Sequence, residues 1–225
     1  MLQIERLCVR IAGADVLRNA SLHVRPNGFV ALVGRNGAGK TTLMRSVMNL
    51  IPSWSGEIRI GERTVTHAKP SDHASNGVGY MPEDRRLIAD WTVEQNILLP
   101  TWACRISDAQ ARLASCYSLI PELVPFAARR AMELSGGQQK LVALARALMV
   151  SRNLLLLDEP FEGVAPALAK RIAEILSELR KTGSLCVLVS ESDAVHSRDI
   201  VDQIYVIERG EIKQPLTPAV PELQR

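Results

Sequence analysis

Apolar and polar residues follow two rhythms along the chain, a period near two that is typical of strands and a period near 3.6 that is typical of helices. Short apolar runs predict strands buried on both faces, at 29–34, 154–158 and 184–190. Shorter or alternating runs predict further strands, at 2–9, 20–25, 56–60, 77–80 and 203–213, the last as a hairpin. Helical spacing predicts helices over 43–51 and 168–179, and a short helix before residue 203. Strands that alternate with helices indicate a parallel sheet covered by helices.

Residues 92–150 interrupt this alternation because their pattern is mostly helical. Thr92, Ser107 and Ser135 stand where a side-chain oxygen caps the start of a helix. We therefore expect a helical subdomain over about 87–150, inserted into the α/β core. The strands within 2–33 and 55–68 predict an antiparallel β-subdomain beside that core, in one domain over 1–225 whose proline-bearing tail, 215–225, is extended.

The composition limits the class of protein. The chain has 225 residues, of which 47% are hydrophobic and 23% charged, and this suits a globular protein with a substantial core. Its net charge of +3 comes from scattered basic residues, so charge neither demands nor excludes a nucleic-acid partner. No segment approaches the roughly 20 apolar residues of a membrane span, and the charged N-terminus does not match a signal peptide. The four cysteines lack paired or metal-ligand spacing, which favours reduced thiols in a cytoplasmic protein, at Cys8, Cys104, Cys116 and Cys186.

The stretch "GRNGAGKT" at 34–41 matches the pattern G-x-x-x-x-G-K-[ST] between a predicted strand and a predicted helix, which is the context of a phosphate-binding loop. Its glycines let successive backbone N–H groups turn toward phosphate oxygens, at Gly34, Gly37 and Gly39. The following helix adds its positive end. Lys40 places a charge on the β- and γ-phosphates, and Thr41 supplies a hydroxyl ligand to Mg²⁺.

The stretch "LLLLDEP" at 154–160 ends a buried strand in two adjacent carboxylates. Buried carboxylates cost several kcal/mol without a compensating cation or hydrogen bonds, so these two acids either lie in solvent or serve a site. In phosphate-loop ATPases a second strand delivers an Asp to the Mg²⁺ shell. The phosphate loop therefore favours Asp158 as a metal ligand and Glu159 as the general base that polarises the attacking water.

The stretch "LSGGQQ" at 134–139 places a serine and two glycines at the start of a helix, which is a second anion-binding end. In a dimer, Ser135 and Gly137 of one subunit can close over the γ-phosphate bound by the other. The three stretches, in this order, closely resemble the ATP-binding cassette (ABC) ATPases over about 2–214. The resemblance implies an α/β P-loop NTPase fold with a RecA-like core, two ATP and Mg²⁺ at a dimer interface, and nucleotide contacts from Gly34, Arg35, Asn36, Gly37, Ala38, Gly39, Lys40, Thr41, Thr42, Ser135, Gly136, Gly137 and Gln138.

The stretches "GYMPEDRR", "TVEQNILL" and "DEPFEGVAP" are similar to the subunits that energise branched-chain amino-acid importers. Most ABC ATPases have a Gln at the position of Glu83, and this Gln touches Mg²⁺. Glu83 departs from that pattern but resembles this branch, where Glu is frequent. The resemblance therefore implies Glu83 as a Mg²⁺ ligand, with an ordinary surface Glu as the alternative. The resemblance implies permease subunits as partners, a second ABC subunit in a homodimer or heterodimer, a periplasmic binding protein indirectly, no nucleic acid, and a cytoplasmic place on the inner face of the plasma membrane. We expect the segment 83–99 to contact the permease through exposed Arg85, Arg86 and Trp91, with a core role as the alternative for Trp91.

Three further positions depart from the family's pattern. Ile11 stands where an aromatic residue usually stacks on adenine. The adenine would then contact only the apolar side chains of Ile11 and Val16. Phe161 replaces a small polar residue. Ser192 occupies the position of the switch histidine, and His196 lies too far along the chain to replace it simply. The catalytic residues are then Glu159, Lys40 and Ser192, and we expect slow but real Mg²⁺-dependent hydrolysis.

The resemblance leaves more than one function open. The favoured function is an ATP-hydrolysing subunit that powers an importer of branched-chain or related amino acids or amides. A soluble ABC ATPase acting on nucleic acid or ribosomes is the alternative, against which stand the single cassette and the mild charge. Ser192 and Ile11 motivate a third possibility, a subunit that senses ATP and hydrolyses little of it. Nothing in the sequence names the transported substrate.

Overall fold

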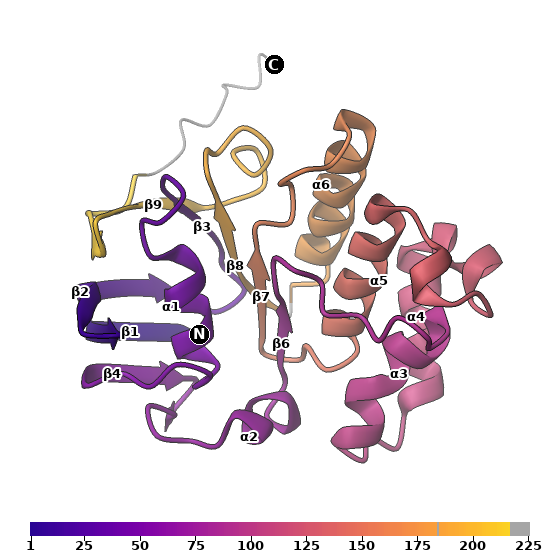
Figure 1. Cartoon of the computed structure of the whole chain (residues 1–225), viewed down its shortest axis with the longest axis horizontal. Coiled ribbons are helices and arrows are strands. Elements are labelled where there is room, and N and C mark those ends of the chain that lie inside the picture. Colours follow the sequence, from indigo (N-terminus) through magenta and orange to yellow (C-terminus); the bar gives the residue numbers. More distant parts are fainter. Residues whose placement is uncertain (184, 217–225) are drawn as a thin grey trace.

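The computed structural model describes residues 1–183 and 185–216, and it contains two sheets and a block of helices (Figure 1). The smaller sheet is antiparallel in the order β2-β1-β4-β5. Its strands are β1 (Leu2–Ile11), β2 (Ala14–Val24), β4 (Ser55–Ile60) and β5 (Arg63–Thr64). This sheet is the antiparallel one that the early strand pattern predicts.

The larger sheet has six strands in the order β10-β9-β3-β8-β7-β6. The strands are β3 (Phe29–Val33), β6 (Val78–Met81), β7 (Leu154–Asp158), β8 (Cys186–Glu191), β9 (Gln203–Glu208) and β10 (Glu211–Ile212). Its strand pairs are parallel except β9 with β10. The expectation that the strands of 2–33 share one antiparallel sheet is wrong for β3, because this apolar strand pairs in parallel with β8 and β9 and is covered on both faces.

The helices form two groups around the larger sheet (Figure 1). Their bounds are α1 (Lys40–Val47), α2 (Pro70–Ser75), α3 (Val93–Ala103), α4 (Ala109–Leu119), α5 (Gly136–Leu148) and α6 (Pro166–Lys181), with 3₁₀ turns at Pro121–Phe126 and Ala131–Glu133. Helices α3, α4 and α5 make up the predicted helical segment. None of the helices in residues 1–183 and 185–216 combines the length and the apolar character needed to cross a membrane.

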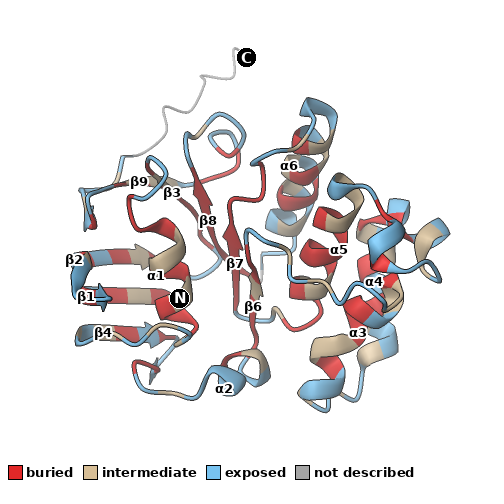
Figure 2. Ribbon diagram, viewed as in Figure 1, coloured by how far each residue is buried: buried red, intermediate tan, exposed pale blue. Residues whose placement is uncertain are grey.

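Two apolar cores cover the two faces of the larger sheet, and β7 contributes to both (Figure 2). Leu155 and Leu157 pack with α3, α5 and α6 in one core. Leu154 and Leu156 pack with α1 and the antiparallel sheet in the other. Successive side chains of a strand point to opposite faces, so a run of four leucines is what a strand between two cores requires.

Local hydrogen bonds decide where the helices begin. Thr92 and Ser135 each cap a helix, and each forms a reciprocal bond with the Gln three residues later. The expected cap at Ser107 is wrong, since α4 follows Asp108 without a side-chain cap bond. The expected short helix before residue 203 is also wrong. Residues 195–200 form turns, with isolated helix-like bonds such as the Arg198 N–H to the Ala194 carbonyl oxygen (3.0 Å) that do not extend into a helix.

The sequence also predicts an extended C-terminal tail and reduced cysteines. The extended tail expected at 215–225 lies outside the described residues from 217 onward, and Leu216 pairs with Ile204 in an isolated bridge. All four cysteines are free thiols, three buried and Cys104 half-buried. Helix α2 has no counterpart among the sequence predictions, because six residues carry too little periodicity.

Candidate functional site

The glycine-rich loop lies between the end of β3 and the start of α1, at the carboxyl edge of the larger sheet. Gly37 and Gly39 have positive φ angles of 81° and 111°, a region that favours glycine. A Cβ on Gly34 would lie 2.4 Å from the Ile207 carbonyl oxygen, and one on Gly39 would lie 2.9 Å from a Leu17 methyl. Close packing and backbone conformation therefore both require glycine in this loop.

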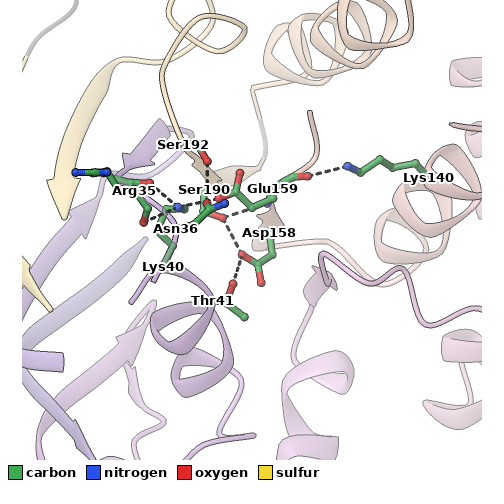
Figure 3. Close-up of polar contacts among 10 residues, drawn as sticks. Arg35, Asn36, Lys40, Thr41, Lys140, Asp158, Glu159, Ser190 and Ser192 are labelled. Carbon is green, nitrogen blue, oxygen red and sulfur yellow. Dashed lines mark hydrogen bonds and ion pairs between the residues drawn. The ribbon is translucent and has the colours of Figure 1, made fainter. Parts of the chain in front are cut away.

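Lys40, the first residue of α1, directs its amine into the loop and is only 5% exposed. Its Nζ donates to the carbonyl oxygens of Gly34 and Arg35 and forms an ion pair with Glu159 Oε1 at 2.9 Å (Figure 3). Burial raises the pKa of Glu159, and the hydrogen bond from Lys40 opposes that rise. Two of the predicted catalytic residues are thus in direct contact.

Asp158 is fully buried, and hydrogen bonds from three elements compensate its carboxylate. The hydroxyls of Ser190 (2.8 Å) and Thr41 (3.1 Å) donate to Oδ1 (Figure 3). The Tyr80 hydroxyl donates to Oδ2 (3.2 Å). Burial raises the pKa of Asp158, and these three bonds oppose the rise. The two acids at the end of β7 therefore belong to a polar site and are not a solvent-exposed strand end.

The oxygen atoms of Thr41 and Asp158 are suitable ligands for a hard cation. A Thr41 hydroxyl next to an Asp158 carboxylate offers oxygen ligands of the kind that Mg²⁺ takes. Across residues 1–183 and 185–216 no cluster of three His, Cys, Asp or Glu side chains could hold a metal alone. Mg²⁺ in nucleotide sites needs only one or two carboxylates, because phosphates and water supply the other ligands. The residues therefore fit Mg²⁺ bound together with a nucleotide.

One cavity of about 510 Å³ joins most of the predicted nucleotide contacts. It is lined by Ile11, Val16, Asn36, Gly37, Gly39, Lys40, Thr41, Thr42, Glu83, Glu159 and Glu162. Of these, only Glu162 is absent from the sequence predictions. Three predicted contacts of the same loop do not line this cavity. Gly34 and Ala38 are buried, and Arg35 is exposed. Ile11 is 41% exposed and gives the cavity an apolar wall without an aromatic ring.

Ser192 lies beside the tip of the phosphate loop. Its hydroxyl donates to Asn36 Oδ1 at 3.1 Å (Figure 3). His196 instead stacks on Phe161, with ring centroids 5.1 Å apart. The structure therefore brings Ser192, and not the nearest histidine, into contact with the loop.

The signature residues face a different cavity. Ser135 and Gln138 bond to each other at the start of α5. Gly136 and Gly137 line a cavity of about 420 Å³ with Glu83, Arg85, Lys140, Glu162, Gly163 and Val164. Only Glu83 and Glu162 line both this cavity and the one at the phosphate loop. Within one chain, the predicted signature contacts and the phosphate loop remain apart.

The segment 83–91 is less exposed than the sequence predicts. Arg86 is exposed, but Arg85 and Trp91 are half-buried. The Arg85 guanidinium donates to the Gly136 carbonyl oxygen (3.2 Å) and to Gln139 Oε1 (3.0 Å), so it holds the start of α5. The ring centroids of Trp91 and Trp102 lie 6.0 Å apart. The expectation that Arg85 and Trp91 are freely exposed is wrong, because each has partners within the chain.

Besides Glu162, four residues of the site are absent from the sequence predictions. Tyr80 and Ser190 bond to Asp158 from neighbouring strands, and Lys140 Nζ donates to the Glu159 carbonyl oxygen at 2.9 Å. Glu191 ends β8 and is 3% exposed, and its Oε1 has no hydrogen-bond partner in the described residues. Ser190 could have been found, since carboxyl ends of parallel strands meet at one edge of a sheet. Nothing in the sequence near Lys140 indicates its contact.

The site combines three features: a glycine-rich phosphate loop, an Asp that can share a cation with the loop, and a Glu that pairs with the loop lysine. Together they define the class of protein as a P-loop nucleotide hydrolase. A family model described as "ABC transporter" matches residues 17–162. The chain therefore belongs to the ABC transporter family, and it is an ABC ATPase.

Named relatives and solved structures agree with this family. The chain is 33% identical to the high-affinity branched-chain amino acid transport ATP-binding protein BraG of Pseudomonas aeruginosa, over 94% of this chain and 91% of BraG. It is 31% identical to the lipopolysaccharide export system ATP-binding protein LptB of Haemophilus influenzae, over 97% of this chain and 91% of LptB. A dimeric ATP-binding cassette in a post-hydrolysis state with ADP and Pi superposes with a TM-score of 0.86 at 22% identity, covering 96% of this chain and 98% of that one. At that identity the structural likeness shows the fold.

Proposed function

We propose that this chain is the ATP-hydrolysing subunit of a membrane importer for branched-chain or related amino acids or amides. The observation that carries the ATPase part is the buried Lys40–Glu159 pair in the phosphate-loop cavity, next to the Asp158–Thr41 pair. The importer part is supported by the similarity to the BraG protein and to the probable branched-chain amino acid transport ATP-binding protein LivF of Archaeoglobus fulgidus. The similarity to LptB, an ATP-binding protein of an export system, supports the transporter ATPase part.

The residues of the loop bind the phosphates of ATP. The loop N–H groups and the positive end of α1 attract phosphate oxygens. These oxygens compete with Glu159 for the Lys40 amine, which releases the Glu159 carboxylate to orient a water. Burial keeps the pKa of Glu159 above its usual value, which makes the carboxylate a better proton acceptor.

Thr41 and Asp158 would hold Mg²⁺, with Glu83 as a further ligand from the cavity wall. When bound, Mg²⁺ neutralises charge on the phosphate oxygens. The hydroxyls of Tyr80 and Ser190 fix the Asp158 carboxylate so that one oxygen stays beside Thr41. The base of ATP would contact the apolar wall formed by Ile11 and Val16, without a stacking ring.

The second subunit completes each nucleotide site. Because Gly136 and Gly137 line a cavity apart from the phosphate loop, we place them against nucleotide held by a partner, together with Ser135 and Gln138 at the start of the same helix. The permease contacts the segment 83–99, on which Arg86 is exposed and Trp91 packs near half-exposed Trp102. The chain would then lie on the inner face of the plasma membrane under permease subunits, with a periplasmic binding protein supplying substrate from the other side.

An ATP-sensing subunit is the second candidate, and Ser192 favours it. The Ser192 hydroxyl bonds to Asn36, so the loop tip contacts a short polar group in place of an imidazole. Positioning donors of this kind contribute on the order of 10²–10³ in rate. Ser192→His should therefore raise the basal rate of an enzyme that already hydrolyses ATP slowly. An unchanged or lower rate in the folded variant would show that Ser192 is not the switch position.

Calorimetry with Lys40→Ala tests nucleotide binding. The parent should bind ATP–Mg²⁺ tightly and Lys40→Ala should not, because the variant loses a buried cation aimed at the phosphates. Lys170→Ala is the matched control, since Lys170 is an exposed lysine on α6. Equal affinity of parent and Lys40→Ala would remove the basis of the proposed function.

A further inference from the structure

The main chain at Glu159 adopts a conformation that its own residue type does not favour. Glu159 has a φ of 50°, in the left-handed region where a non-glycine residue persists only if its surroundings enforce it. Its N–H donates to Ser190, both to Oγ (3.1 Å) and to the carbonyl oxygen (3.2 Å). Its carbonyl oxygen accepts from Lys140 Nζ (2.9 Å) (Figure 3). Side chains from two other elements thus hold both peptide groups that flank Glu159.

Lys140 is an unusual residue for this task. It lies one turn into α5, is 4% exposed, and also donates to the Glu162 carbonyl oxygen at 2.6 Å. It forms no ion pair with a carboxylate in the part of the chain that the structure describes. Burial lowers its pKa. Burying an ammonium group is unfavourable unless it is well bonded, and both of its bonds go to the loop that carries Glu159.

Ser190 supplies the other contact. It is fully buried at the carboxyl end of β8, among apolar neighbours of the strand. Its hydroxyl accepts from the Glu159 N–H and donates to Asp158 Oδ1. One hydroxyl therefore links the position of Glu159 to the position of Asp158.

We propose that Lys140 and Ser190 are positioning residues that hold the main chain of Glu159, and that Lys140 makes the position of the Glu159 carboxylate depend on α5. The proposal rests on the proposed function, in which Glu159 is the general base. Helix α5 begins at the signature residues, so a partner's nucleotide bound there would act on the same helix that holds this subunit's own base. Occupancy of one site would then influence hydrolysis in the other.

Lys140→Met tests this role, because Met has a similar length and no donor. We expect kcat to fall on the order of 10- to 100-fold, as for a small misplacement of a catalytic group. The affinity of a single chain for ATP should stay within about twofold, since Lys140 lines the cavity at the signature and no part of the phosphate-loop cavity. Lys140→Arg keeps the donors and should recover most of the loss, and Lys170→Met on α6 is the control. Ser190→Ala should lower kcat and raise the Mg²⁺ concentration needed for half of the maximal rate.

Single-turnover rates in a Glu159→Gln background distinguish a failure of the positioning role from a failure of the proposed function. If Lys140 acts through Glu159, adding Lys140→Met to Glu159→Gln should change the rate by less than about twofold. An equal 10- to 100-fold loss in both backgrounds would overturn the proposal, as would a folded Lys140→Met variant with the kcat of the parent. If Glu159→Gln itself hydrolyses ATP like the parent, the proposed function fails first, and the positioning role falls with it.

Discussion

The buried carboxyl of Glu191 makes the stability of the protein depend on pH in a defined direction. Glu191 is 3% exposed, and burial raises its pKa from 4.5 to about 7, with the negative charges of Asp193 and Glu159 adding to the effect. Between these two values the unfolded chain ionises this acid while the folded chain keeps it protonated. The contribution of Glu191 to stability is therefore fully present below pH 4.5 and is lost as the pH rises through 7.

The magnitude follows from the two pKa values. The interval from 4.5 to about 7, at 1.36 kcal/mol per pH unit, corresponds to about 3 kcal/mol of unfolding free energy. About 2–3 kcal/mol of this loss falls between pH 5 and pH 8, because the unfolded acid is already largely ionised at pH 5. Above pH 8 the contribution is constant.

Urea unfolding of the parent and of Glu191→Gln at pH 5, 6, 7 and 8 measures this contribution. The amide cannot ionise, so the stability of the variant relative to the parent should rise by about 2–3 kcal/mol from pH 5 to pH 8. Glu178→Gln, on the exposed face of α6, should follow the parent at every pH. If the unfolding free energies of Glu191→Gln and the parent changed in parallel with pH, the prediction would be wrong. Such a result would mean that Glu191 ionises alike in the folded and the unfolded chain.

Two further predictions concern the segment before α3. Asn96 is fully buried and bonds to the backbone of Ile88, Trp91 and Thr92, so Asn96→Ala should lower the unfolding free energy by about 2–4 kcal/mol in urea. A loss below 0.5 kcal/mol, roughly what a surface change costs, would contradict this. Arg86→Glu should weaken co-purification with the permease and spare ATP binding, and unchanged co-purification would count against that surface.

Features that depend on residues close together in the sequence could be predicted. The loop needs glycine for a positive φ at Gly37 and Gly39 and for close packing at Gly34, and the sequence pattern shows this spacing directly. The four leucines of β7 likewise indicate a strand between two cores. Thr92 and Ser135 encode helix starts, because each bonds within three residues of itself.

The remaining features depend on residues far apart in the sequence. Ser190 and Tyr80 meet Asp158 across 32 and 78 residues, and Arg85 reaches Gly136 across 51 residues. No periodic pattern encodes such contacts. The left-handed backbone of Glu159 is likewise enforced by bonds from other elements and not by its own type. The assignment of β3 to the larger sheet depends on its pairing with β8 and β9, which a single strand's pattern does not specify.

The mass of the Glu159→Gln variant in saturating ATP–Mg²⁺, measured by light scattering, is the sharpest single test of the proposed function. The proposal is that Glu159 is the general base and that two chains close over ATP through the phosphate loop of one and the signature of the other. The variant should bind ATP, hydrolyse it far more slowly than the parent, and shift from the 24.7 kDa of one chain to twice that mass. A protein that binds ATP yet keeps the mass of one chain, or that hydrolyses ATP at the parent's rate, would contradict the account.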